Sequence, residues 1–89
     1  MINTDIKITN RLGLHARPAA QLAQTAARFQ SDIKITKDQV EVNAKSIMGV
    51  LMLAAEYGST LHLVCNGSDE QEAHQAITAL FTNNFNEDF

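Results

Sequence analysis

Apolar residues change their spacing several times within 89 residues, and this change limits the folds open to the chain. Over residues 2–9, isoleucine and threonine alternate with polar residues, which is typical of a half-buried strand. From Ala16 to Gln30 the spacing becomes helical and predicts a helix of about four turns. The single proline, Pro18, fits only the first turn of such a helix, where a missing N–H costs nothing. The helix must therefore begin at about residues 15–17.

The later strands follow the same alternating pattern. Residues 32–37 predict a strand, and a tight turn connects it to a returning strand that carries Val40 and Val42. Two strands joined so closely indicate a hairpin. A further strand is predicted over residues 60–66, with its inward face formed by Leu61, Leu63 and Cys65.

Two more helices are predicted. A short one follows Ser46, a favourable N-cap residue. The last one follows residues 68–71, whose Ser-Asp-Glu-Gln sequence predicts a capping box. Its apolar stripe is the clearest in the chain and consists of Ala73, Ala76, Ile77, Leu80 and Phe81.

The resulting order is βαββαβα, within a single domain spanning residues 1–89. Every strand has one apolar face and every helix has one apolar stripe, and helices on one face of an antiparallel sheet bury both. The first strand–helix–strand unit is expected to leave a gap that the last strand fills, a split βαβ arrangement. The prediction is an α+β fold with four antiparallel strands and three helices on one face.

Composition excludes several classes of protein. A net charge of −3 argues against general nucleic-acid binding. No apolar run approaches the ~20 residues of a membrane span. The single cysteine, Cys65, excludes a disulfide framework or a cysteine-rich zinc site within one chain, and it fits a reducing, cytoplasmic setting. The three histidines lack metal-ligand spacing, so no metal site is expected.

The charges are unevenly distributed along the chain. Residues 1–45 hold all seven Lys and Arg residues and carry a net +3, whereas residues 46–89 carry −6. A basic half can steer a protein toward an acidic partner or an anion. The alternative is that folding mixes the halves and the asymmetry cancels in space.

Residues 13–18, Gly-Leu-His-Ala-Arg-Pro, combine a nucleophile, a cation and a helix N-terminus. Imidazole is a competent nucleophile near neutral pH, which makes His15 a candidate. The free N–H groups of the first turn, together with Arg17, favour an anion such as a phosphoryl group. The alternative is that His15 only caps the helix and Arg17 is a solvated charge. His62 and His74 lie off the apolar faces and suggest no such role.

Two segments carry a resemblance to a known family. Residues 13–19 are similar to the active-site signature of the histidine-containing phosphocarrier (HPr) family, and residues 44–50, Ala-Lys-Ser-Ile-Met-Gly-Val, resemble its second signature. The resemblance extends over the whole chain in length and element order. It implies an open-faced β-sandwich of four antiparallel strands and three helices.

The resemblance also implies a cytoplasmic relay protein of a phosphotransferase system, with no cofactor and no turnover of its own. His15 would accept phosphate on ring Nδ1 from enzyme I and pass it to an enzyme IIA protein, and Arg17 would stabilise the phosphate. Residues 51–55 and the tail over residues 79–88 most resemble the nitrogen-related branch, NPr. The alternative is a sugar-transport HPr, because residues 45–49 also resemble carriers that a serine kinase modifies, at Ser46 here.

Exposed apolar residues beside His15 are expected to form a docking patch for partners, with Leu14, Ile47, Met48 and Leu51 as candidates. Some of these could instead belong to the core, Leu51 first among them. Two distant alternatives for the function remain, an acylphosphatase-like hydrolase and a regulatory binding module that carries no phosphate.

Overall fold

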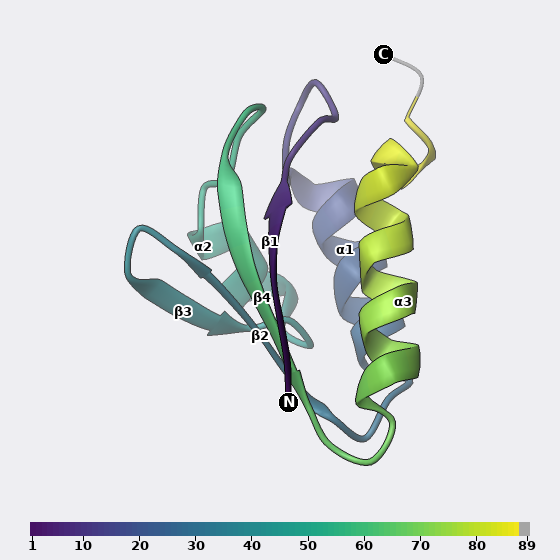
Figure 1. The fold of residues 1–89 in the computed structure, drawn as a ribbon. Helices are drawn as coiled ribbons and strands as arrows, with labels where there is room; N and C mark the ends of the chain where they lie inside the picture. The colour runs from purple at the N-terminus through teal and green to yellow at the C-terminus, as the bar shows by residue number, and fades with distance from the viewer. Residues whose placement is uncertain (88–89) are drawn as a thin grey trace.

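The computed structural model describes residues 1–87 and contains one antiparallel sheet, shown in Figure 1. The strand order is β1-β4-β2-β3, so the last strand in sequence lies between the first two. The predicted split arrangement is therefore confirmed, and it leaves β1 and β3 as the two edges. The strands are β1 (Ile2–Lys7), β2 (Asp32–Lys37), β3 (Val40–Asn43) and β4 (Thr60–Asn66).

Three α-helices accompany the sheet, in the predicted α+β fold with its helices on one face. Figure 1 shows α1 and α3 lying side by side along this face, and α1 also contacts α2. A short 3-10 helix, η1, follows α3 and was not predicted. The helices are α1 (Ala16–Ala26), α2 (Ile47–Met52), α3 (Glu70–Thr82) and η1 (Asn84–Asn86).

The core lies between the sheet and the helices. The register pairs Ile6 with Leu61 and Ile35 with Leu63, which places the apolar residues of neighbouring strands on one face. Leu61, Leu63 and Cys65 are at most 1 % exposed, as their alternation predicted. Burial, and secondarily the charge of Glu70, raise the pKa of the Cys65 thiol, so the cysteine is a core residue rather than a nucleophile.

Helix α1 is shorter than predicted and ends at Ala26 rather than at Gln30. The amides of Arg28 and Phe29 donate to the carbonyls of Thr25 and Ala26, a tighter pattern than the α-helical one. The apolar spacing continues past the end of the helix because the side chain of Phe29 still packs on the core from this turn.

The capping box predicted at the start of α3 is wrong. The N-cap is Asp69, and its carboxylate makes no cap bond to its own helix. It accepts instead from the amides of Gln30 and Ser31, both at 2.9 Å, and from the Ser31 hydroxyl. These bonds lower the pKa of Asp69, with the Ser31 hydroxyl contributing most. Asp69 thus ties the start of α3 to the segment that leads into β2.

Candidate functional site

The loop between β1 and α1 is fixed by a close approach of two backbones. Gly13 has a φ of +66°, and a Cβ there would lie 2.5 Å from the carbonyl oxygen of Ala55. The next residue, Leu14, donates its amide to the same oxygen at 2.9 Å. Its side chain is only 4 % exposed. The prediction that Leu14 belongs to an exposed docking patch is therefore wrong, because the backbone contact turns this residue into the core.

His15 occupies the N-cap position of α1 with extended backbone angles, φ −77° and ψ −171°. Its side chain makes no capping bond, so it is free for another role. Its carbonyl accepts from the amide of Ala19 at 3.0 Å. Pro18 has no amide hydrogen, which leaves the N–H groups of Ala16 and Arg17 without partners in the helix. The helix begins where the proline predicted it would.

A buried carboxylate holds the His15 ring. Nε2 of His15 lies 2.8 Å from Oε2 of Glu87, and the side chain of Glu87 is 0 % exposed while that of His15 is 34 % exposed. The other carboxylate oxygen, Oε1, accepts from the side-chain amide of Asn10 at 3.0 Å. That same Asn10 nitrogen donates to the carbonyl of Gly13 at 2.8 Å. Three segments of the chain therefore meet behind the imidazole.

Sequence reasoning found His15 but missed Asn10 and Glu87. Glu87 lies 72 residues after His15 in the chain, and no spacing rule connects the two. Asn10 is one of several polar residues where β1 ends, and nothing in the sequence shows that its side chain is buried. The only available signal was the phenylalanine of the tail, Phe85, whose apolar side chain must pack somewhere and carries Glu87 with it.

Arg17 lies in the first turn of α1, two residues after His15, and its side chain is exposed. Within residues 1–87 its guanidinium makes no hydrogen bond or ion pair. The cation and the two unpartnered amides are therefore on the same end of the helix as the histidine. This arrangement favours an anion bound next to the imidazole.

The second motif forms α2, which packs against α1 beside the His15 loop. Ser46 is its N-cap, and its hydroxyl accepts from the amide of Gly49 at 3.0 Å, as predicted. Ile47 and Met48 are 42 % and 70 % exposed, so both are available as surface residues. Leu51 is only half-buried against the core, so the expectation that it would be the first of the four to belong there is wrong, because Leu14 is the one in the core.

The other histidines have structural partners on the sheet. Nδ1 of His62 lies 2.8 Å from Oδ1 of Asp5, and Nε2 of His74 lies 2.7 Å from the hydroxyl of Thr4. Across residues 1–87, no group of three or more His, Cys, Asp or Glu side chains is placed to hold a metal ion. Among the helices of the same residues, none is long and apolar enough to cross a membrane.

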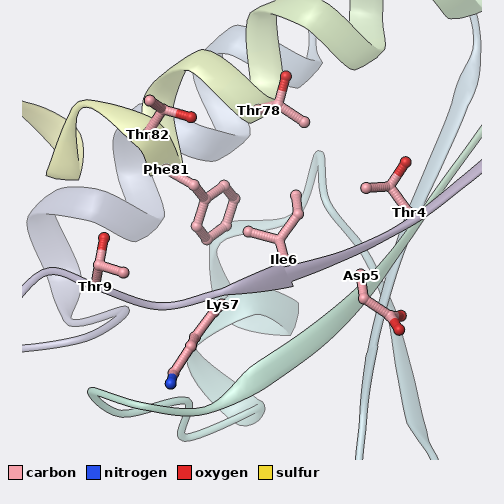
Figure 2. Close-up of a pocket in the computed structure, with 8 residues that line it drawn as sticks. All are labelled: Thr4, Asp5, Ile6, Lys7, Thr9, Thr78, Phe81 and Thr82. Carbon is pink, nitrogen blue, oxygen red and sulfur yellow. The ribbon is translucent and has the colours of Figure 1, made fainter.

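A pocket of about 430 Å³ lies between β1 and α3, away from the histidine loop (Figure 2). Figure 2 shows Ile6 and Phe81 pointing toward one another across it, while Asp5 and Lys7 point to the opposite side of the strand. None of its lining residues belongs to residues 10–17. The reactive side chains are thus gathered at an open surface and not in this pocket. Its lining residues are Thr4, Asp5, Ile6, Lys7, Thr9, Thr78, Phe81 and Thr82.

Comparison with known proteins identifies the family to which the chain belongs. A family model described as the PTS HPr component phosphorylation site matches residues 2–83. The chain belongs to the HPr family. A phosphocarrier protein HPr from Cupriavidus necator is 52 % identical over 98 % of each chain, and one from Xylella fastidiosa is 49 % identical over 99 % of each. The solved structure of HPr-C-His from Thermoanaerobacter tengcongensis superposes with a TM-score of 0.96 at 45 % identity, and the match covers 100 % of both chains.

Proposed function

We propose that this HPr-family protein carries a phosphoryl group on His15 between enzyme I and an enzyme IIA protein of a phosphotransferase system. The observation that supports this most directly is the state of the His15 ring. Nε2 is engaged by Glu87 at 2.8 Å, which leaves Nδ1 as the ring nitrogen able to accept a phosphoryl group. Arg17 and the two unpartnered amides of α1 lie at the same helix end and can stabilise the charge of that group.

The transfer is balanced without a cofactor. The lone pair on Nδ1 attacks phosphorus, an Nδ1–P bond forms, and the P–N bond to the donor histidine of enzyme I breaks. The proton on Nε2 stays in place. The reverse sequence delivers the group to a histidine of the IIA protein. The chain therefore acts as an intermediate and has no turnover without its partner enzymes.

We further propose that the exposed side chains of Ile47 and Met48 form the docking patch for both partners, and that the relay operates in the cytoplasm. They lie on α2, which packs against α1, and the first turn of α1 carries the exposed cation Arg17. Such a combination suits a partner with an apolar contact face and acidic rim. Leu14 does not belong to this docking patch, because its side chain is buried.

We place the chain in the nitrogen-related branch rather than among sugar-transport carriers. Support comes from residues 51–55 and from the tail over residues 79–88, of which Asp88 lies outside the described residues. The branches can be separated by incubating the chain with the nitrogen-type and the sugar-type enzyme I of its own source. A higher initial rate of phosphorylation by the nitrogen-type enzyme is expected, and a higher rate with the sugar-type enzyme would reverse the assignment.

The carrier function itself is tested with His15→Ala. The wild-type chain should acquire phosphate from phosphorylated enzyme I in a linkage that is labile in acid and stable in base, as expected of an N–P bond. His15→Ala should keep the wild-type circular dichroism but melt at a lower temperature, because the buried carboxylate of Glu87 loses its partner, and the folded variant should accept no phosphate. Full labelling of His15→Ala, or no labelling of the wild type, would favour the hydrolase or the non-phosphorylated binding module instead.

A further inference from the structure

The proposed transfer uses Nδ1 of His15 and leaves one feature of the site without a purpose. Glu87 is a carboxylate whose side chain is 0 % exposed, and a buried carboxylate is costly unless its oxygens are fully paired. Among residues 1–87, each oxygen has one partner, Asn10 at 3.0 Å and His15 at 2.8 Å. A buried charge aimed at the reactive side chain indicates a role in the chemistry of that side chain.

The tail is built to hold this carboxylate in place. Asn84, Phe85 and Asn86 have φ values of 51°, 55° and 60°, a left-handed run that side chains other than glycine rarely adopt. The run is held by Phe85, which is 0 % exposed and packs edge-on against Phe81 with ring centroids 4.9 Å apart. Asn84 also accepts a hydrogen bond from the Thr9 hydroxyl. Strained backbone that persists under such constraints commonly serves a functional site.

The direction of each hydrogen bond follows from chemistry. The carbonyl of Gly13 can only accept, so the Asn10 atom that faces it must be the amide nitrogen. The same nitrogen faces Glu87 and therefore donates to it. An ionised carboxylate can only accept, so Nε2 of His15 must carry the proton in their shared bond.

We propose that Glu87 is a positioning residue that keeps the proton of neutral His15 on Nε2, and so leaves the lone pair on Nδ1. Asn10 in turn holds the carboxylate in register with the ring. This inference rests on the proposed phosphoryl transfer for its consequence, but the tautomer itself exists in the free protein. A partner on the far ring nitrogen commonly sets which nitrogen of a histidine reacts.

Glu87→Gln separates this role from a purely structural one. The glutamine has the same shape, and Asn10, held by Gly13, continues to present a donor. The glutamine oxygen must therefore face Asn10, which turns its NH₂ group toward Nε2 of His15. Nε2 then has to accept, and the proton moves to Nδ1. The variant is expected to reverse the tautomer while keeping the packing.

The first experiment measures the imidazole ¹⁵N chemical shifts of the unphosphorylated full chain at a pH where His15 is neutral. We expect wild type to show a protonated Nε2 and a bare Nδ1, and Glu87→Gln to show the reverse. Glu87→Ala, which removes both possibilities, should show a mixture. Glu72→Gln removes one charge from the exposed side of α3 and should leave His15 unchanged. The signals of His62, which pairs with Asp5, serve as an internal control in every variant.

The second experiment measures phosphorylation by enzyme I. Glu87→Gln should accept phosphate at least about tenfold more slowly than wild type and Glu72→Gln, since its reactive tautomer is depopulated by the loss of one charge-assisted bond. A predominant Nδ1–H tautomer in wild type, or no change in Glu87→Gln with the fold intact, would overturn the inference even if His15 is phosphorylated. If His15 proves not to carry phosphate while the tautomer reverses as expected, the proposed function fails and the positioning role of Glu87 stands.

Discussion

Replacing Gly13 by alanine is expected to disturb the site through the backbone alone. The new Cβ would lie 2.5 Å from the carbonyl oxygen of Ala55 and 2.7 Å from Cα of Glu56. Both contacts are with backbone atoms, so neither can be relieved by a side-chain rotation. Gly58 provides a matched control, because it also has a positive φ, +86°, but no atom lies within 4 Å of a Cβ placed there.

The difference between the two substitutions isolates the close approach. Both alanines must adopt a left-handed conformation at about 1–2 kcal/mol, and both gain about 0.4–1 kcal/mol from a less flexible unfolded chain. Only Gly13→Ala must also push residues 13 and 55 apart, which breaks the 2.9 Å bond from the Leu14 amide to Ala55. That bond is worth about 1 kcal/mol, and the residual strain adds to it. Gly13→Ala should therefore unfold more easily than Gly58→Ala by about 1–3 kcal/mol.

Urea denaturation followed by circular dichroism measures this difference. With an m value of about 1 kcal/mol/M, the midpoint of Gly13→Ala should lie about 1 M or more below that of Gly58→Ala. Phosphorylation of His15 by enzyme I should also slow about tenfold or more in the surviving folded protein, because a displacement of about 1 Å misplaces a reacting group. Equal midpoints for the two variants would refute the claim that this backbone contact holds the loop.

Three further changes test other parts of the molecule. Arg17→Ala should slow transfer to and from His15 by roughly tenfold or more, the loss of one charge-assisted contact of ~1.5–3 kcal/mol, and unchanged rates would show that the helix amides suffice. Ser46→Asp should melt no lower than wild type, because a negative N-cap is favourable, yet receive phosphate from enzyme I more slowly at low salt; a wild-type rate there would limit Ser46 to capping. The lowered pKa of Asp69 means that its bonds stabilise the fold above the ordinary aspartate pKa and are lost as pH falls through the lower folded value. The melting temperature of wild type should thus drop more steeply below about pH 4 than that of Asp69→Asn, and parallel curves would contradict this.

The architecture was predictable because local rules coincide with the global fold. Pro18 placed the start of α1, and the alternation in β4 placed Leu61, Leu63 and Cys65 in the core. The hairpin was predictable because apolar and polar residues alternate in both flanking strands. Its turn consists of Asp38 and Gln39, which both have positive φ. These features depend on neighbours within a few positions, which a sequence shows directly.

The failures at Leu14, Asp69 and Glu87 share a different origin, since each depends on contacts between distant segments. Leu14 seemed exposed because it sits in a polar loop beside a helix end, but the backbone contact with Ala55 turns it inward. Residues 68–71 had the pattern of a capping box, but the Asp69 carboxylate instead accepts from the segment before β2, 38 residues away. Glu87 had no local pattern at all. Long-range hydrogen bonds of this kind leave no periodicity in a sequence.

The contacts of His15 divide between the two sides of its ring in a way that suits a carrier. The contacts that fix the ring, through Glu87 and Asn10, are buried and lie on the Nε2 side, and a phosphoryl group on Nδ1 would take no part in them. The groups available to the phosphoryl itself are the exposed Arg17 and the first amides of α1. Exposed contacts of this kind are weaker than buried ones because water competes for them. The ring can therefore be held rigidly for attack while the phosphate is held only loosely, and a loosely held group can be passed on to the next histidine.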